Sequence, residues 1–95
     1  MKFEEHCQEC IIKLGKPYEE VHKWLDEFAG KKPHGMHHRQ FRHHRQGIAD
    51  CCMVFGEEAY EPAKLHIISD LKMEGWTEDD EIPANEKDYL RMDLF

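Results

Sequence analysis

Apolar side chains recur at every third or fourth position along most of the chain, which is the spacing of one face of an α-helix. The apolar face of the first segment consists of Phe3, Cys7, Cys10, Ile11 and Leu14. Gly15 ends this segment, and Pro17 can begin the next helix because the first helical residue needs no backbone N–H. The second stripe consists of Tyr18, Val21, Leu25 and Phe28, with Gly30 as a candidate C-cap.

A long third helix is predicted over residues 37–55 and ends at Gly56. Its inward face carries His37, Phe41, His44, Ile48, Cys51 and Phe55. A fourth helix is predicted over 62–74, and an acidic loop and a short terminal helix over about 76–95. Because no segment alternates as a β-strand does, we expect an all-α fold. We expect a small single-domain bundle of four or five helices over 1–95.

The composition excludes several classes of protein. A length of 95 residues suits one domain, and 40% hydrophobic residues argue against a disordered chain. The formal net charge of −7 argues against nucleic acid as a partner. No apolar run approaches the roughly 20 residues needed to cross a membrane, and the polar start does not resemble a signal peptide. We therefore expect a cytoplasmic protein without a membrane partner.

Histidine and charge are unevenly distributed. Five of the eight histidines lie within residues 34–44, beside three arginines. Residues 1–47 hold nine Lys and Arg against seven Asp and Glu, a balance of +2, whereas residues 48–95 hold four against thirteen, a balance of −9. The histidine-rich segment is therefore the first candidate for a functional site.

The four cysteines resemble a zinc-binding set only superficially. Cys7 and Cys10 lie inside a helical pattern, whereas structural zinc sites take such pairs from turns. Cys51 and Cys52 are adjacent in a predicted helix, so their side chains point about 100° apart. We expect reduced thiols that act mainly as small buried apolar residues, with zinc binding as the alternative.

Two pairs of residues place an imidazole and a carboxylate on one helical face. His22 and Asp26 are four residues apart in the second helix, and His66 and Asp70 repeat the spacing in the fourth. Such a pair is commonly a structural contact on its own. Two pairs on neighbouring helices favour a shared site.

The segment around residue 43 adds further candidates. His44 lies on the inward face of the predicted helix, where an imidazole needs a carboxylate, a carbonyl or a metal as its partner. It is therefore either a core histidine or a ligand. His38 and His43 lie away from that face, so one is expected at its boundary and the other in solvent. Gly47 is unfavourable inside a helix and would let another helix or a ligand approach closely.

These residues also carry a resemblance. The pattern runs through His22-x-Trp24-Leu25-Asp26, His38-Arg39-x-Phe41-Arg42-His43-His44-x-x-Gly47-Ile48, Phe55-Gly56, His66-x-x-x-Asp70-Leu71 and Ile82-Pro83. It resembles a family of short prokaryotic proteins described only as a domain of unknown function. The resemblance covers about residues 17–84 and implies that these residues form one site. It implies no reaction.

Together the pairs predict a divalent-metal site at the centre of the bundle. Its candidate ligands are His22, Asp26, His43 or His44, His66 and Asp70, with His38 beside them. Imidazole and carboxylate ligands suit zinc, iron, manganese or nickel. An open coordination position would let a metal-activated water hydrolyse an ester, with Arg39 or Arg42 binding an anionic group such as phosphate. Helical phosphohydrolases of the HD type offer an analogy, although their His-Asp dipeptide is missing here.

Two alternatives come from other classes of protein. In the first, the histidine- and arginine-rich segment of a non-catalytic module contacts an acidic partner or a nucleic-acid backbone. In the second, the histidines only satisfy one another and nearby carboxylates in a small helical protein, which could form a homodimer. The sequence therefore leaves open whether the protein is an enzyme and whether a small anionic ligand is its partner.

Overall fold

The computed structural model describes residues 2–27 and 42–92. These ranges contain five α-helices, one short 3-10 helix and no strand. The elements are α1 (Phe3–Leu14), α2 (Glu19–Leu25), α4 (Arg45–Phe55), η2 (Glu57–Ala59), α5 (Tyr60–Met73) and α6 (Glu86–Arg91). The prediction of a small all-α fold is confirmed.

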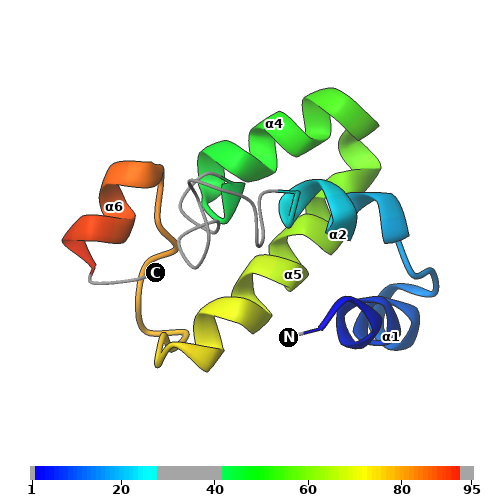
Figure 1. The fold of residues 1–95 in the computed structure, drawn as a ribbon, viewed down its shortest axis with the longest axis horizontal. Coiled ribbons are helices and arrows are strands. Elements are labelled where there is room, and N and C mark those ends of the chain that lie inside the picture. Colours follow the sequence, from blue (N-terminus) through cyan, green and yellow to red (C-terminus); the bar gives the residue numbers. More distant parts are fainter. Residues whose placement is uncertain (1, 28–41, 93–95) are drawn as a thin grey trace.

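Helix α5 is the central element, because α1, α2 and α4 all pack against it (Figure 1). Helix α6 lies at the opposite side of the molecule from α1. This arrangement lets side chains from the first half of the chain meet side chains of α5. The space between the helices holds an apolar core and, beside it, a group of buried polar side chains.

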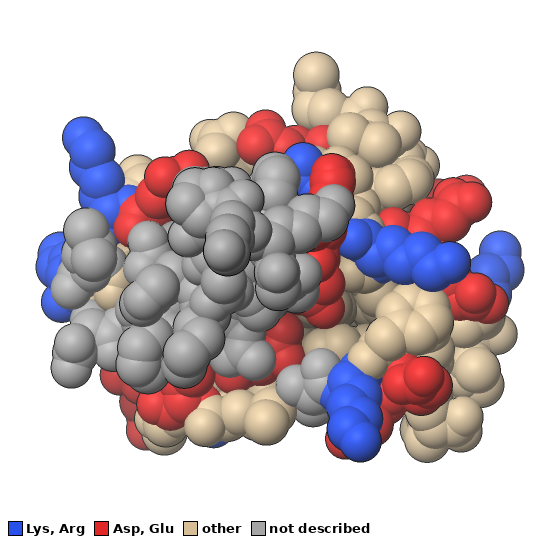
Figure 2. Space-filling model, in the orientation of Figure 1, with Lys and Arg blue, Asp and Glu red and all other residues tan. Residues whose placement is uncertain are grey.

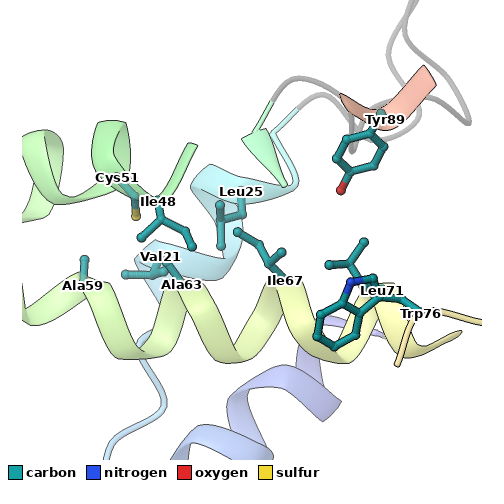
Figure 3. Packing of buried hydrophobic residues seen from close by; sticks show 10 residues of the cluster. All are labelled: Val21, Leu25, Ile48, Cys51, Ala59, Ala63, Ile67, Leu71, Trp76 and Tyr89. Atoms are coloured by element: carbon teal, nitrogen blue, oxygen red, sulfur yellow. The ribbon is translucent and has the colours of Figure 1, made fainter. Parts of the chain in front are cut away.

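One stripe of α5 is apolar and packs into the hydrophobic core shown in Figure 3. The core consists of Val21, Leu25, Ile48, Cys51, Ala59, Ala63, Ile67, Leu71, Trp76 and Tyr89. Full burial of each large aliphatic side chain stabilises the fold by about 1.5–3 kcal/mol. A second buried stripe of α5, shifted by one residue from Ile67 and Leu71, carries His66 and Asp70. The helix therefore buries an apolar face and a polar face side by side.

Helix α2 begins two residues later than predicted. Its first residue is Glu19 rather than Pro17, and the preceding Tyr18 has a left-handed backbone with φ 54° and ψ 45°. The helix ends at Leu25, with Asp26 as its C-cap. The predicted extension to Phe28 and Gly30 lies outside the described residues.

The third predicted helix is interrupted where it was expected to be continuous. Helix α4 begins only at Arg45, and His44 has an extended backbone with φ −154° and ψ 175°. The prediction of one helix over 37–55 is therefore wrong at residues 43–44, and residues 37–41 lie outside the described ranges. The first two backbone N–H groups of α4 donate hydrogen bonds to the carbonyls of Pro83 and Ala84, which lie in a distant segment of the chain. They are therefore not available to the preceding residues, so the helix does not extend towards the N-terminus.

Gly47 permits a close crossing at the start of α4. A Cβ atom at this position would overlap the backbone carbonyl of Arg42. The chain therefore turns back over the first turn of α4 immediately before His43. A close approach at Gly47 is confirmed, but the approaching group is the backbone of Arg42, five residues earlier, and not another helix or a ligand.

The surface carries charges of both signs. Lys and Arg side chains are interspersed with Asp and Glu on the face shown in Figure 2, and the described part of that face has no continuous basic surface. Among the described residues, no helix is long and apolar enough to span a membrane. The acidic-partner and nucleic-acid alternatives stay predictions, because most of the histidine-rich segment lies outside the described ranges.

Candidate metal centre

Six histidine and aspartate side chains meet between α1, α2, α5 and the segment before α4. They are His6, His22, Asp26, His43, His66 and Asp70. The four histidines and Asp70 are buried, whereas the Asp26 side chain retains 28% of its exposure. A polar cluster of this size inside a 95-residue protein needs a compensating interaction for every member.

Four donor atoms of the cluster lie close together. His43 Nε2 lies 3.0 Å from Asp70 Oδ2, 3.1 Å from His66 Nε2 and 3.3 Å from Asp26 Oδ1. His66 Nε2 lies 3.3 Å from Asp70 Oδ2 and 3.4 Å from Asp26 Oδ1. Ligands about 2.0–2.1 Å from a transition metal are separated by about 3.3 Å in a tetrahedral site and about 3.0 Å in an octahedral one. Five of the six separations therefore match those of ligands around a single ion, and Asp26 and Asp70 offer oxygens within 4.8 Å of each other.

The charges of the cluster also favour a cation. Burial opposes ionisation of Asp70, but the neighbouring imidazoles of His43, His6 and His66 outweigh it and hold the pKa of this carboxyl far below its usual value. Asp70 is therefore ionised at neutral pH, and the partly exposed Asp26 adds a second carboxylate. The two carboxylates bring two negative charges to the cluster, which a divalent cation would balance.

His22 lies behind His66 rather than among the four donor atoms. Its Nδ1 is 2.8 Å from His66 Nδ1, and its Nε2 is 2.9 Å from the carbonyl oxygen of Pro17. Burial, together with the neighbouring His66 and His6, lowers the pKa of His22 to about 4. His22 is therefore neutral at physiological pH and contacts a candidate ligand from the outside.

His6 occupies a similar place behind Asp70. Its ring stacks on His66, with 3.6 Å between the ring centroids and 16° between the planes, and its Nε2 lies 3.2 Å from Asp70 Oδ1. One ligand atom each from His6, Asp26, His66 and Asp70 lie within 4.8 Å of one another. However, a histidine binds a metal in the plane of its ring, and two stacked rings have separate planes. We therefore assign His6 to the support of Asp70 and not to the same ion as His66.

His43 is held in place from several sides. The hydroxyl of Tyr89 donates a hydrogen bond to its backbone carbonyl. The neighbouring Arg42 guanidinium lies 3.9 Å from the Trp24 ring and donates to the Trp24 carbonyl at 2.6 Å and to Glu27 at 3.4 Å. These contacts join the segment before α4 to the end of α2. They bring His43 next to Asp26.

The structure brings together five of the residues predicted for the site: His22, Asp26, His43, His66 and Asp70. The expectation that one of His38 and His43 is exposed does not hold for His43, which is fully buried. His44 has another place, because its Nδ1 accepts a hydrogen bond from the Gly47 N–H and its ring lies beside Tyr89. It caps α4 and is not brought into the cluster.

The remaining site predictions have different outcomes. Arg42 is engaged with Trp24 and Glu27, so its role in binding an anion stays a prediction. Arg39 and His38 lie outside the described residues. His6 was not predicted as a site residue. Its position three residues after Phe3 and four before Cys10 would have placed it on the inward face of the first helix.

The four cysteines lie apart from the cluster. All are free thiols, with Cys10 and Cys51 buried and Cys7 and Cys52 partly exposed. Burial is the main cause that raises the pKa of both Cys10 and Cys51 to about 11. No cysteine belongs to a candidate metal group among the described residues, and the interpretation as small buried residues fits Cys10 and Cys51.

Comparison with known families now places the chain. Residues 1–92 match the family described as a domain of unknown function, DUF6915. The chain belongs to the DUF6915 family. The match begins before the region of resemblance noted in the sequence, so the DUF6915 domain includes α1 and His6 as well as the other cluster residues. Comparisons with the curated proteins and with the solved structures gave no match.

Proposed function

We propose that this protein binds one divalent transition metal through His43, His66, Asp26 and Asp70. The observation that carries the proposal is the grouping of four donor atoms, five of whose six separations are 3.0–3.4 Å. Without a cation, two carboxylates and the imidazole nitrogens would face one another in the protein interior. The donor set of two nitrogens and two oxygens suits zinc, iron, manganese or nickel.

The reaction that we propose for this centre is hydrolysis of an anionic ester of the phosphate type. A bound metal would lower the pKa of a coordinated water and so supply a nucleophile at neutral pH. Asp26 is the partly exposed ligand, so the Asp26 side offers solvent and substrate an approach. Two surface hollows, of about 560 and 500 Å³, lie at the acidic loop and at the start of α2, and no cluster residue lines them. A purely structural metal is therefore the competing outcome.

The binding proposal is tested with protein purified without an affinity tag. We expect about one equivalent of metal by elemental analysis, loss of that metal on chelation, and its return on incubation with the metal ion. At a metal concentration of about 100 times Kd, binding stabilises the folded state by about 2.7 kcal/mol. This corresponds to a rise of about 10–20 °C in Tm for a domain of this size.

Two matched histidine variants localise the ion. His66→Gln should abolish metal retention, whereas His44→Asn should keep it, because His44 is also buried but only caps α4. Equal retention by the two variants, or no rise in the Tm of the metal-free protein with any of the four metals, would overturn the proposed site.

The hydrolytic proposal has its own assay. Metal-reconstituted protein should hydrolyse bis(p-nitrophenyl) phosphate or p-nitrophenyl phosphate, and His66→Gln should lose this activity. Stoichiometric metal binding without turnover of either ester would refute the hydrolase and identify the ion as structural.

A further inference from the structure

Two successive hydrogen bonds connect the Pro17 carbonyl, through the His22 ring, to the proposed metal ligand His66. The Pro17 carbonyl contacts His22 Nε2 at 2.9 Å, and His22 Nδ1 contacts His66 Nδ1 at 2.8 Å. The other nitrogen of His66, Nε2, is the atom that faces Asp26, Asp70 and His43. Each bond in the series constrains the position of one proton.

The positions of the protons follow in order from the carbonyl. A carbonyl oxygen can only accept, so His22 Nε2 carries a hydrogen. His22 is buried, and its two ring nitrogens contact a carbonyl and another imidazole rather than a carboxylate. Because a buried cation without a counter-ion is costly, His22 is neutral and its Nδ1 has a lone pair. That lone pair accepts the hydrogen of His66 Nδ1. When His66 is neutral, its Nε2 is bare and directs a lone pair at the other donor atoms.

We propose that Pro17 and His22 act as a positioning relay that holds His66 in the tautomer with a hydrogen on Nδ1 and a metal-binding lone pair on Nε2. The role of this tautomer in metal binding rests on the proposed metal centre. Metal-ligating histidines generally donate their other ring N–H to an acceptor that fixes the ring and increases its basicity. Here the acceptor is a second imidazole, which is itself oriented by a backbone carbonyl.

The backbone at the start of α2 supports this interpretation. Tyr18 is the one non-glycine residue with positive φ among the described residues. A left-handed conformation costs an ordinary residue roughly 1–2 kcal/mol, and such strain is concentrated at functional sites. Tyr18 lies between Pro17 and the first residue of α2, so its backbone conformation sets the direction of the Pro17 carbonyl relative to the helix. This carbonyl contacts His22 on the same helix.

A parallel contact holds the second ligand of α5. His6 Nε2 lies 3.2 Å from Asp70 Oδ1, while Asp70 Oδ2 faces His43 and His66. Each of the two ligands four residues apart on α5 therefore has a histidine of another helix on its outer side. His22 comes from α2 and His6 from α1.

The relay is tested first in the metal-free protein by ¹⁵N NMR, which distinguishes protonated from bare ring nitrogens through long-range couplings. We expect a hydrogen on His22 Nε2 and on His66 Nδ1, and a bare His66 Nε2. A hydrogen on Nε2 and none on Nδ1 of His66 would overturn the relay, whether or not the protein binds metal. The expected tautomers in a protein that fails to bind metal would instead overturn the proposed function alone.

Two substitutions then test the consequence for binding. His22→Phe keeps a ring but removes the acceptor, and it should weaken metal binding by about 10–100-fold and abolish the His66 tautomer preference. His22→Asn provides an oxygen near the position of Nδ1 and should restore both readouts to within a few-fold of wild type. Equal losses in the two folded variants would show that His22 only fills space, and would refute the relay. If His22→Phe does not fold, the wild-type NMR assignment remains decisive.

Discussion

Replacing Gly47 with alanine tests the chain crossing that delivers His43 to the cluster. On helix propensity alone, this change should stabilise the protein by about 1 kcal/mol, because glycine is the poorer helix former. The structure predicts the opposite sign. The added Cβ would overlap the Arg42 carbonyl, and even the Arg42 Cα would lie only 2.8 Å away, which is closer than real Cβ contacts come. The atoms that the new Cβ would meet all belong to the Arg42 backbone, so the clash cannot be relieved by rotating a flexible side chain.

The magnitude follows from the two opposing effects. Overpacking of this kind costs typically 1–3 kcal/mol and more where backbone must move. Subtracting the gain in propensity leaves a net loss of up to about 2 kcal/mol, and more where backbone shifts. At about 4–8 °C per kcal/mol for a domain of this size, a loss of about 2 kcal/mol lowers Tm by about 8–16 °C. Because Arg42 immediately precedes His43, metal affinity should fall as well.

The assay is thermal and urea denaturation followed by circular dichroism, together with metal titration. Ala49→Gly is the matched control, because Ala49 is exposed in the same helix and its replacement should cost only about 1 kcal/mol without affecting the metal. A higher Tm for Gly47→Ala with unchanged metal binding would refute the crossing and, with it, the placement of His43.

Two further predictions concern contacts around this framework. Tyr89→Phe removes the hydrogen bond to the buried His43 carbonyl, and we expect a loss of about 1–3 kcal/mol in urea denaturation together with weaker metal binding; an unchanged midpoint would contradict the contact. At pH 8, iodoacetamide should modify only the two partly exposed cysteines of the native protein, as read by mass spectrometry. Cys10 and Cys51 should react only after unfolding, because they are buried and their pKa is raised to about 11. Rapid native modification of all four thiols would show that the packing of α1 or α4 is wrong.

The spacing in the sequence predicted the part of the site that is local to single helices. His66 and Asp70 lie on one face of α5 because four residues make nearly one turn, and this holds in the structure. The same rule separated Cys51 from Cys52: Cys51 is buried in the core, whereas Cys52 is partly buried and packs against it. Such relations depend on helix geometry alone, so a single sequence is enough to reveal them.

The choice between His43 and His44 could not be made in this way. A continuous helix turns His44 inward, but the actual chain is extended at His44 and turns His43 into the cluster. The break depends on carbonyls of Pro83 and Ala84, which approach α4 only in the folded protein. A distant backbone contact of this kind leaves no periodic signal near residue 43.

His6 was missed for a different reason. Its helix carries no acidic residue at the spacing that identified the other pairs, and its partner Asp70 belongs to another helix. Only the packing of α1 against α5 shows that a histidine on the inward face of the first helix meets that carboxylate. Its place on an inward helical face could have suggested burial but not a partner.

The contacts that place His43 set the order in which the centre can form. Tyr89 lies 46 positions after His43, and Pro83 lies far along the chain from the α4 turn that it caps. Helices form within microseconds, whereas contacts between distant positions must first close long loops. A growing polypeptide could therefore build α1 and α2 early but could not complete the cluster before residues 83–89 had left the ribosome. Metal uptake would then follow synthesis and would report that the whole domain has folded.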